Sequence, residues 1–189
     1  MKHSPDNEHS YKSTSGIVLN NGDMKLLEPL QWLNDKIIEF YLELVVERSQ
    51  INPLLPKVYA FNTNFFNKLR RNAASAMRWT MKVDLQSFDI ILVPIHLPGH
   101  WLYRLWTCER KECITSILCL EMERLSARAQ RIPPSFGTIP TQMNGSDCGV
   151  FLCRFAECIA RDADTDFKAA DMNEFRKKIV QGIKSGKLI

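Results

Sequence analysis

Cys148 occupies a position where a cysteine side chain could act as a nucleophile. The Asn-Gly pair at 144–145 predicts a tight turn, and Ser146 or Asp147 can cap a helix that begins at about Cys148. A thiol in the first turn of a helix lies beside unpaired backbone N–H groups, whose partial positive charge stabilises the reactive thiolate. Gly149 leaves room for a substrate backbone. For a cysteine considered alone, a buried structural residue is the more common interpretation.

Two further side chains have types that would complete such a site. His100 follows an apolar stretch and could take the thiol proton at a sheet edge. Gln142 lies six residues before the cysteine, and its amide could donate to a developing oxyanion. His96 is the competing base, but it lies inside the apolar run, which favours a hydrogen-bonded core histidine. Two histidines four residues apart suggest a metal site only on a helix, and Pro94 and Pro98 argue against a helix here.

Helices and one buried strand must hold these residues in place. The near-continuous apolar run at 89–97 predicts a strand that is buried on both faces. Apolar residues at helical spacing predict four helices, and Asn34 or Asp35 would cap the first and an Asp171/Glu174 capping box the last. The four predicted helices span residues 32–49, 63–71, 148–161 and 171–186.

The composition is that of an ordinary globular domain. The chain has 189 residues, of which 45% are hydrophobic and 24% charged, and its net charge of +4 would suit an acidic partner without requiring nucleic acid. Its basic residues are scattered without interleaved aromatic residues, which argues against nucleic-acid binding. The six cysteines include no CxxC pair, and we find no secretory signal or membrane span. We therefore expect an intracellular protein with free thiols.

Five sequence blocks, taken together, resemble one known family. PTQMNGSDCGVFLCRFAE at 140–157 is similar to the nucleophile motif of the SUMO-specific (Ulp/SENP) cysteine proteases. The other blocks follow in that family's order: WLNDKIIEFY at 32–41, YAFNTNFFNKL at 59–69, RWTMKVD at 78–84 and DIILVPIHLPGHW at 89–101. The resemblance implies a papain-like α+β fold of the Ulp/adenain type, with a central mixed sheet flanked by helices.

The resemblance also implies roles for individual residues. Cys148 would be the nucleophile, His100 the general base and Gln142 the oxyanion donor. Trp32 and Trp101 would line a tunnel that only the Gly-Gly tail of a modifier is thin enough to enter. Trp32 could instead be a core residue at a helix start.

Asp35 matches an acidic position of the family that contacts the modifier, although it could instead simply favour a helix N-terminus. The implied activity is cleavage after the Gly-Gly of a SUMO-like modifier, both in precursors and in SUMO-conjugated proteins. The expected protein is a monomer that needs no metal or cofactor and binds neither nucleic acid nor membrane. The resemblance implies a nuclear location, and the alternative is a cytoplasmic one. Residues 1–22 are expected to be a disordered leader and residues 23–189 the catalytic domain, atypical at 102–138.

The middle of the chain departs from the family pattern. The Asp that orients the histidine should lie seventeen residues after His100, where this sequence has Ile117. No Asp occurs between Asp89 and Asp147, and Glu121 and Glu123 are out of register, so the triad is incomplete. One alternative to a SUMO protease is therefore a catalytically impaired protein that still binds the modifier. A second alternative is a protease for a neddylation-type modifier, because relatives within the family differ in the modifier they cleave.

A shift of reading frame would explain this departure. Residues from Leu102 to about Arg131 fit no expected element, although the family resemblance implies a strand of the sheet in this region. If the codons after Trp101 are read two bases later, the overlap of Ser116 with Ile117 can encode Asp at the expected position. We therefore hypothesise that about 102–123 is a frame-shifted stretch. Sequencing the transcript across Trp101 tests this, and an uninterrupted frame encoding Leu102-Tyr103-Arg104 would contradict it.

Overall fold

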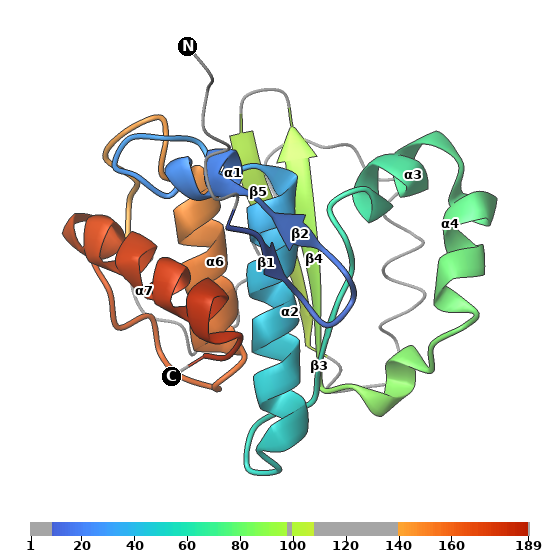
Figure 1. Ribbon diagram of the computed structural model, residues 1–189. Coiled ribbons are helices and arrows are strands. Elements are labelled where there is room, and N and C mark those ends of the chain that lie inside the picture. Colours follow the sequence, from blue (N-terminus) through green and yellow to red (C-terminus); the bar gives the residue numbers. More distant parts are fainter. Residues whose placement is uncertain (1–8, 98–99, 108–139, 189) are drawn as a thin grey trace.

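A mixed β-sheet with helices on both faces forms the centre of the protein (Figure 1). The computed structural model describes residues 9–97, 100–107 and 140–188. The elements are, in chain order, β1 (Tyr11–Lys12), β2 (Val18–Leu19), α1 (Asn21–Lys25), α2 (Asp35–Ile51), β3 (Val58–Ala60), α3 (Phe65–Arg71), α4 (Ala73–Thr80), η1 (Leu85–Ser87), β4 (Ile90–Leu97), β5 (His100–Thr107), α6 (Cys148–Ile159), η2 (Ala169–Asp171) and α7 (Met172–Ser185). This arrangement confirms the predicted α+β fold.

The strand β4 lies between β3, which is parallel to it, and β5, which is antiparallel. Its side chains alternate between two hydrophobic clusters. Ile90 and Leu92 pack with α2, α6 and α7, whereas Ile91 and Val93 pack on the opposite face with α3. The strand is therefore buried on both faces, as its continuous apolar sequence predicts. Beyond Ile95 the strand leaves the core, because His96 is exposed and Leu97 half-buried.

The helix boundaries follow local capping chemistry. Asn34 caps α2 by accepting a hydrogen bond from the backbone N–H of Ile37 at 3.0 Å. Gly186, in the left-handed conformation at φ 66°, ends α7 as predicted. The predicted capping box of α7 is wrong, because the carboxylate of Asp171 accepts instead from the backbone N–H of Lys168 at 2.7 Å.

The segment before α1 is part of the folded domain. β1 and β2 pair as a short antiparallel hairpin, and Ser15 in its turn donates to the Glu43 carboxylate of α2 through its backbone N–H and its hydroxyl, at 2.5 and 2.6 Å. Leu19 is fully buried in the main core. The predicted disorder of residues 1–22 is therefore wrong for residues 11–22, because the hairpin buries this apolar side chain. Residues 1–8 lie outside the described part.

The doubtful middle segment begins as a regular strand. Residues 102–107 complete β5 and pair with Ile90–Ile95 of β4. The expectation that the segment from Leu102 fits no element is thus wrong for these six residues, because their backbone groups extend the antiparallel ladder. The remainder of the segment, residues 108–131, lies outside the described residues.

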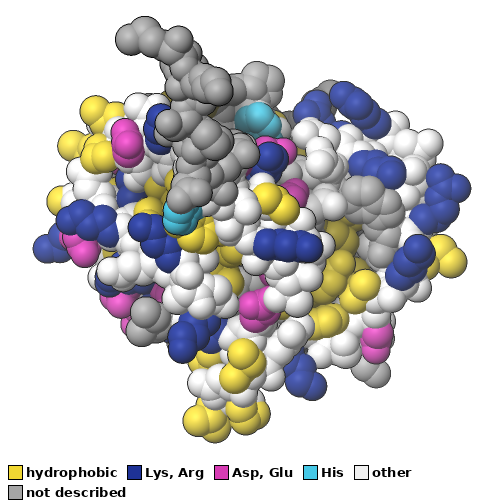
Figure 2. All heavy atoms as spheres, in the orientation of Figure 1, with side chains coloured by type: hydrophobic (Ala, Val, Ile, Leu, Met, Phe, Trp, Pro, Cys, Tyr) yellow, Lys and Arg dark blue, Asp and Glu magenta, His cyan; other side chains and the backbone are white. Residues whose placement is uncertain are grey.

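The face shown in Figure 2 carries Lys and Arg side chains spread across it, together with Asp and Glu, without one continuous basic patch. Among the described residues, no helix combines the length and the apolar character needed to span a bilayer.

Truncation of Leu19 tests whether the hairpin belongs to the domain. We expect Leu19→Ala to lower the free energy of unfolding by about 2–4 kcal/mol, because it removes a fully buried side chain from the main core. Val18→Ala is the matched control on the same strand. Val18 is 45% exposed, and its truncation should cost within about 0.5 kcal/mol. Urea unfolding of both variants measures the difference, and equal small effects would mean that the hairpin is not packed on the core.

Candidate functional site

A hydrogen-bonded turn presents Cys148 as the first residue of α6. The side-chain oxygen of Asn144 accepts from the backbone N–H groups of Ser146 and Asp147, each at 2.9 Å, which closes the turn that the sequence predicts. Asp147 is the N-cap residue, but its side chain makes no capping hydrogen bond. The thiol therefore lies at the helix tip, where the helix dipole favours a negative charge. Cys148 is only 3% exposed, so just a thin group could reach it.

The other described cysteines of α6 are poor nucleophiles. Cys153 is completely buried, and burial raises the pKa of its thiol well above the ordinary value. Burial likewise raises the pKa of Cys158 to about 11. Both thiols are protonated near neutral pH, and a protonated thiol is a poor nucleophile. Position on the helix therefore favours Cys148 over the other two.

Leu33 is the point where α6 and β5 meet the segment that leads into α2. A Cβ added to Gly149 would lie 3.0 Å from the Cβ of Leu33, so the first turn of α6 packs against this residue with no space for a side chain. On its other side, the carbonyl oxygen of Leu33 accepts a hydrogen bond from the indole N–H of Trp101 at 3.0 Å.

This arrangement has a consequence for the predicted pair. Gly149 directly follows Cys148, and Trp101 directly follows His100. Both neighbours contact the same residue, so the nucleophile candidate and the base candidate belong to one corner of the molecule. In agreement, α6 packs against β5. His100 is exposed at the start of β5, where its backbone pairs with Leu97.

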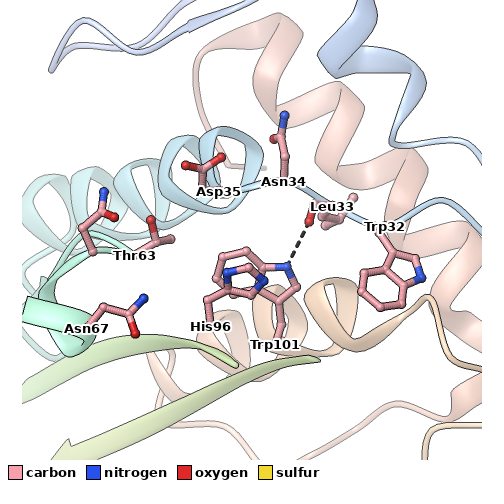
Figure 3. A pocket seen from close by; sticks show the side chains of 9 residues that line it. Trp32, Leu33, Asn34, Asp35, Thr63, Asn67, His96 and Trp101 are labelled. Carbon is pink, nitrogen blue, oxygen red and sulfur yellow. Dashed lines mark hydrogen bonds between the residues drawn. The ribbon is translucent and has the colours of Figure 1, made fainter. Parts of the chain in front are cut away.

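A cleft of about 290 Å³ opens beside this corner (Figure 3). The structure brings all three predicted substrate-binding residues to it: Trp32, Asp35 and Trp101. Trp32 is 47% exposed at the cleft, whereas Trp101 is buried and held by Leu33. The core interpretation of Trp32 is therefore wrong, because the segment before α2 turns its indole outward.

His96 also lines the cleft, which contradicts the prediction of a core histidine. Its ring stacks on the indole of Trp101, with centroids 4.2 Å apart and an interplanar angle of 20°. The two residues are opposite one another in the β4–β5 ladder, which brings their rings face to face where the strand leaves the core. His96 is thus a wall of the cleft.

Gln142 does not point toward Cys148 in a hydrogen bond, and the position of the orienting residue lies outside the described part of the chain. The side-chain amide of Gln142 donates to the backbone carbonyl of Asn144, so it is turned toward its own loop. The expected position of the orienting Asp, Ile117, lies outside the described residues, as do Glu121 and Glu123.

Sequence reasoning missed several cleft residues. Asn34, Thr63, Asn64 and Asn67 line the polar side of the cleft. Both the N–H and the hydroxyl of Thr63 donate to the Glu39 carboxylate, at 2.8 and 2.7 Å, which fixes the loop before α3 against α2. All four residues fall within the WLNDKIIEFY and YAFNTNFFNKL blocks, so the blocks themselves were the available signal.

The close packing at Leu33 makes Gly149 intolerant of a side chain. We expect Gly149→Ala to lower the free energy of unfolding by about 1–2 kcal/mol, because the new methyl group meets a Cβ that cannot rotate away. Gly145→Ala is the matched control in the adjacent turn, where an added Cβ meets no atom within 4 Å, and should cost within about 0.5 kcal/mol. Thermal unfolding measures both, and a harmless Gly149→Ala would contradict this packing.

Comparison with known proteins agrees with this geometry. The family model described as the Ulp1 protease family, C-terminal catalytic domain, matches residues 31–121 and 111–185. The two matched segments overlap at 111–121, inside the stretch that departs from the family pattern. A sentrin-specific protease of Caenorhabditis elegans is 40% identical over 194 residues, which cover 92% of this chain and 28% of that protein. Sentrin-specific protease 2 of Homo sapiens is 34% identical over 204 residues, covering 95% and 34%.

The chain thus spans about a third of the length of these relatives. Among solved structures, the C-terminal Ulp1 protease domain in complex with Smt3, the yeast ortholog of SUMO, superimposes with a TM-score of 0.71 at 24% identity. The superposition covers 96% of this chain and 90% of that one, and it shows a shared fold. By sequence and by architecture, this chain belongs to the Ulp1 protease family and corresponds to its C-terminal catalytic domain.

Proposed function

We propose that this chain is a thiol protease domain that hydrolyses the bond after the C-terminal glycine of a SUMO-type modifier. The observation that carries the proposal is the meeting of three segments at Leu33: the start of α6 with Cys148, the start of β5 with His100, and the segment with Trp32. The relatives named sentrin-specific protease, and the Ulp1 domain bound to a SUMO ortholog, support the same substrate class.

The proposed reaction has two steps. His100 removes the thiol proton, and the sulfur of Cys148 attacks the glycyl carbonyl carbon. Backbone N–H groups at the start of α6 stabilise the oxyanion, joined by Gln142 once its amide leaves the Asn144 carbonyl. The C–N bond breaks as the amine takes the proton from His100. Water then attacks the thioester, which releases the modifier carboxylate and restores the thiol.

Sterics at the cleft account for the proposed specificity. The two indoles of Trp32 and Trp101 line the same cleft, and Trp101 is fixed by its hydrogen bond to Leu33. A chain that passes beside such rings toward a thiol that is 3% exposed must be thin, which favours glycine. Asp35, in the first turn of α2, offers a carboxylate to a basic group of the modifier. Precursors and conjugated proteins both present this Gly-Gly end, so we propose processing and deconjugation, with the nucleus as the location.

One observation favours a second candidate function. The sequence has no Asp between Asp89 and Asp147, so no Asp follows His100 at the expected spacing. A histidine without its orienting partner is a weaker base, although the thiolate itself can persist. The second candidate is therefore a catalytically impaired domain that binds the modifier through Trp32, Asp35 and Trp101.

Replacement of Cys148 separates the two candidates. For a protease, we expect Cys148→Ser to reduce cleavage of a SUMO–fluorophore conjugate by at least about a thousandfold, since the hydroxyl of serine is hardly ionised at neutral pH. Cys153→Ala is the matched control, because Cys153 lies on the same helix but inside the core. Its activity per folded molecule should stay within about twofold of the parent.

A SUMO derivative with a C-terminal vinyl sulfone gives an independent measurement on the same variants. The parent and Cys153→Ala should be labelled at Cys148, as located by peptide mapping, and Cys148→Ser should not. Binding of SUMO without any labelling would establish the impaired binding domain. If the chain neither binds SUMO nor is labelled by the vinyl sulfone, the SUMO assignment is contradicted.

Replacement of His100 and replacement of His96 should change different kinetic constants. We expect His100→Asn to lower kcat by about a hundredfold or more, because it removes the general base. His96→Asn removes a ring that stacks on Trp101, so it should mainly raise KM. Steady-state kinetics with the same conjugate measure both constants. A larger loss of kcat for His96→Asn than for His100→Asn would reverse the assignment of the base.

A further inference from the structure

Arg176 of α7 is one of the most deeply buried side chains of the protein, at 1% exposure. Its guanidinium makes two hydrogen bonds to one carboxylate oxygen of Asp147, at 3.2 Å from Nε and 2.7 Å from Nη2. It also donates to three backbone carbonyls, those of Leu26 and Glu28 from Nη1 at 3.1 and 3.0 Å, and that of Gln31 from Nη2 at 2.7 Å. Every nitrogen of the guanidinium is thus engaged.

These partners lie next to the residues of the proposed site. Asp147 directly precedes Cys148, and Gln31 directly precedes Trp32. One side chain therefore ties the segment that carries the cleft tryptophan to the start of the nucleophile helix, although α7 itself lines no part of the cleft.

The turn that Arg176 holds is strained. Leu30 has a φ of 61°, a left-handed conformation that bulky side chains rarely adopt. The carbonyls of Glu28 and Gln31, on either side of it, both accept from Arg176. A strained backbone of this kind persists only where its surroundings fix it. Here the guanidinium binds the backbone on both sides of Leu30, together with the hydrogen bond from the Gln31 N–H to the Glu28 carbonyl at 3.3 Å.

The negative charge of Asp147 lies next to Cys148 and is paired with Arg176. A carboxylate directly before the nucleophile disfavours a second negative charge on the thiol. The N-cap side chain usually accepts from the N–H groups of its own helix, but Asp147 makes no such bond and instead faces Arg176 and the Asn144 amide. The buried cation therefore neutralises the anion beside Cys148.

We propose that Arg176 is a positioning residue, which sets the Trp32 segment against the start of α6 and neutralises Asp147 beside the nucleophile. The proposal rests on the proposed role of Cys148, but its first test needs no modifier. The test is the rate at which iodoacetamide alkylates Cys148 in the folded chain, followed by mass spectrometry of the peptide that contains it.

Arg176→Gln should slow this alkylation at least about fivefold, because an uncompensated carboxylate reduces the thiolate fraction. A merely structural role gives the opposite sign, since loosening the fold exposes the buried thiol and speeds alkylation. Adding Asp147→Asn to Arg176→Gln removes the uncompensated charge and should restore the rate to within about twofold of the parent. A parental or faster rate in Arg176→Gln, or a double variant as slow as the single one, would overturn the electrostatic role.

Arg48→Gln is the matched control. Arg48 also forms an ion pair with α6, to Glu157 at 2.8 Å, which is partly buried and lies near the opposite end of the helix from Cys148. This variant should not slow alkylation of Cys148. If it slows the reaction as much as Arg176→Gln does, the effect is a general result of breaking an ion pair to α6, and the proposal fails.

Arg176→Lys tests the positioning role, and it also serves if the Gln variant does not fold. Lysine keeps the charge, but its single ammonium cannot reach Asp147 and three carbonyls together. Because the charge is kept, the alkylation rate of Cys148 should stay within about twofold of the parent. Because the hydrogen bonds to the carbonyls are lost, the Trp32 segment should loosen and KM for the SUMO conjugate should rise about tenfold. A parental KM would refute the positioning of Trp32. An inactive parent would count against the proposed function alone, because the alkylation rates would still report on Arg176.

Discussion

The packing of Leu33 against both α6 and β5 is the constraint on which the candidate site depends. Its Cβ lies 3.0 Å from the place that a Cβ at position 149 would take, and its carbonyl accepts the Trp101 indole N–H at 3.0 Å. The first contact favours a glycine directly after Cys148, and the second fixes the residue directly after His100. A backbone segment with one buried apolar side chain thus brings two distant sequence blocks to one corner, without itself having a chemical role.

Arg176 strengthens the same junction from the other side. Burying a guanidinium costs much solvation, and such a side chain is tolerated only when nearly all its donors are satisfied. Its bonds to Asp147 and to the carbonyls of residues 26, 28 and 31 meet this condition. The contact at Leu33 and the bonds of Arg176 both join the segment before α2 to the start of α6, so α7 supports the site from outside the cleft.

The segment that departs from the family pattern follows directly after the start of β5, next to this corner. β5 begins with His100 and continues the ladder to Thr107, so the base candidate stands on a regular strand. The residue expected to orient its imidazole would come from a later position, where the sequence has Ile117 instead of Asp. A thiolate at a helix tip depends mainly on the helix and its neighbours, whereas an efficient base depends on its orienting partner. The proposed thiolate and the proposed base therefore depend on different parts of the fold.

The sequence alone determined several of the elements and the residue types of the candidate site. The continuous apolar run fixed β4 as a strand buried on both faces, capping residues fixed the start of α2 and the end of α7, and the ordered blocks pointed to Cys148, His100, Trp32, Asp35 and Trp101. Only the tertiary structure decided which polar residues face the cleft and which lie in the core. His96 is a cleft wall because β4 leaves the core at that residue, and residues 11–22 are folded because Leu19 is buried in the core. Arg176 and Leu33 escaped prediction because their importance lies in contacts with residues distant in sequence, which no local pattern records.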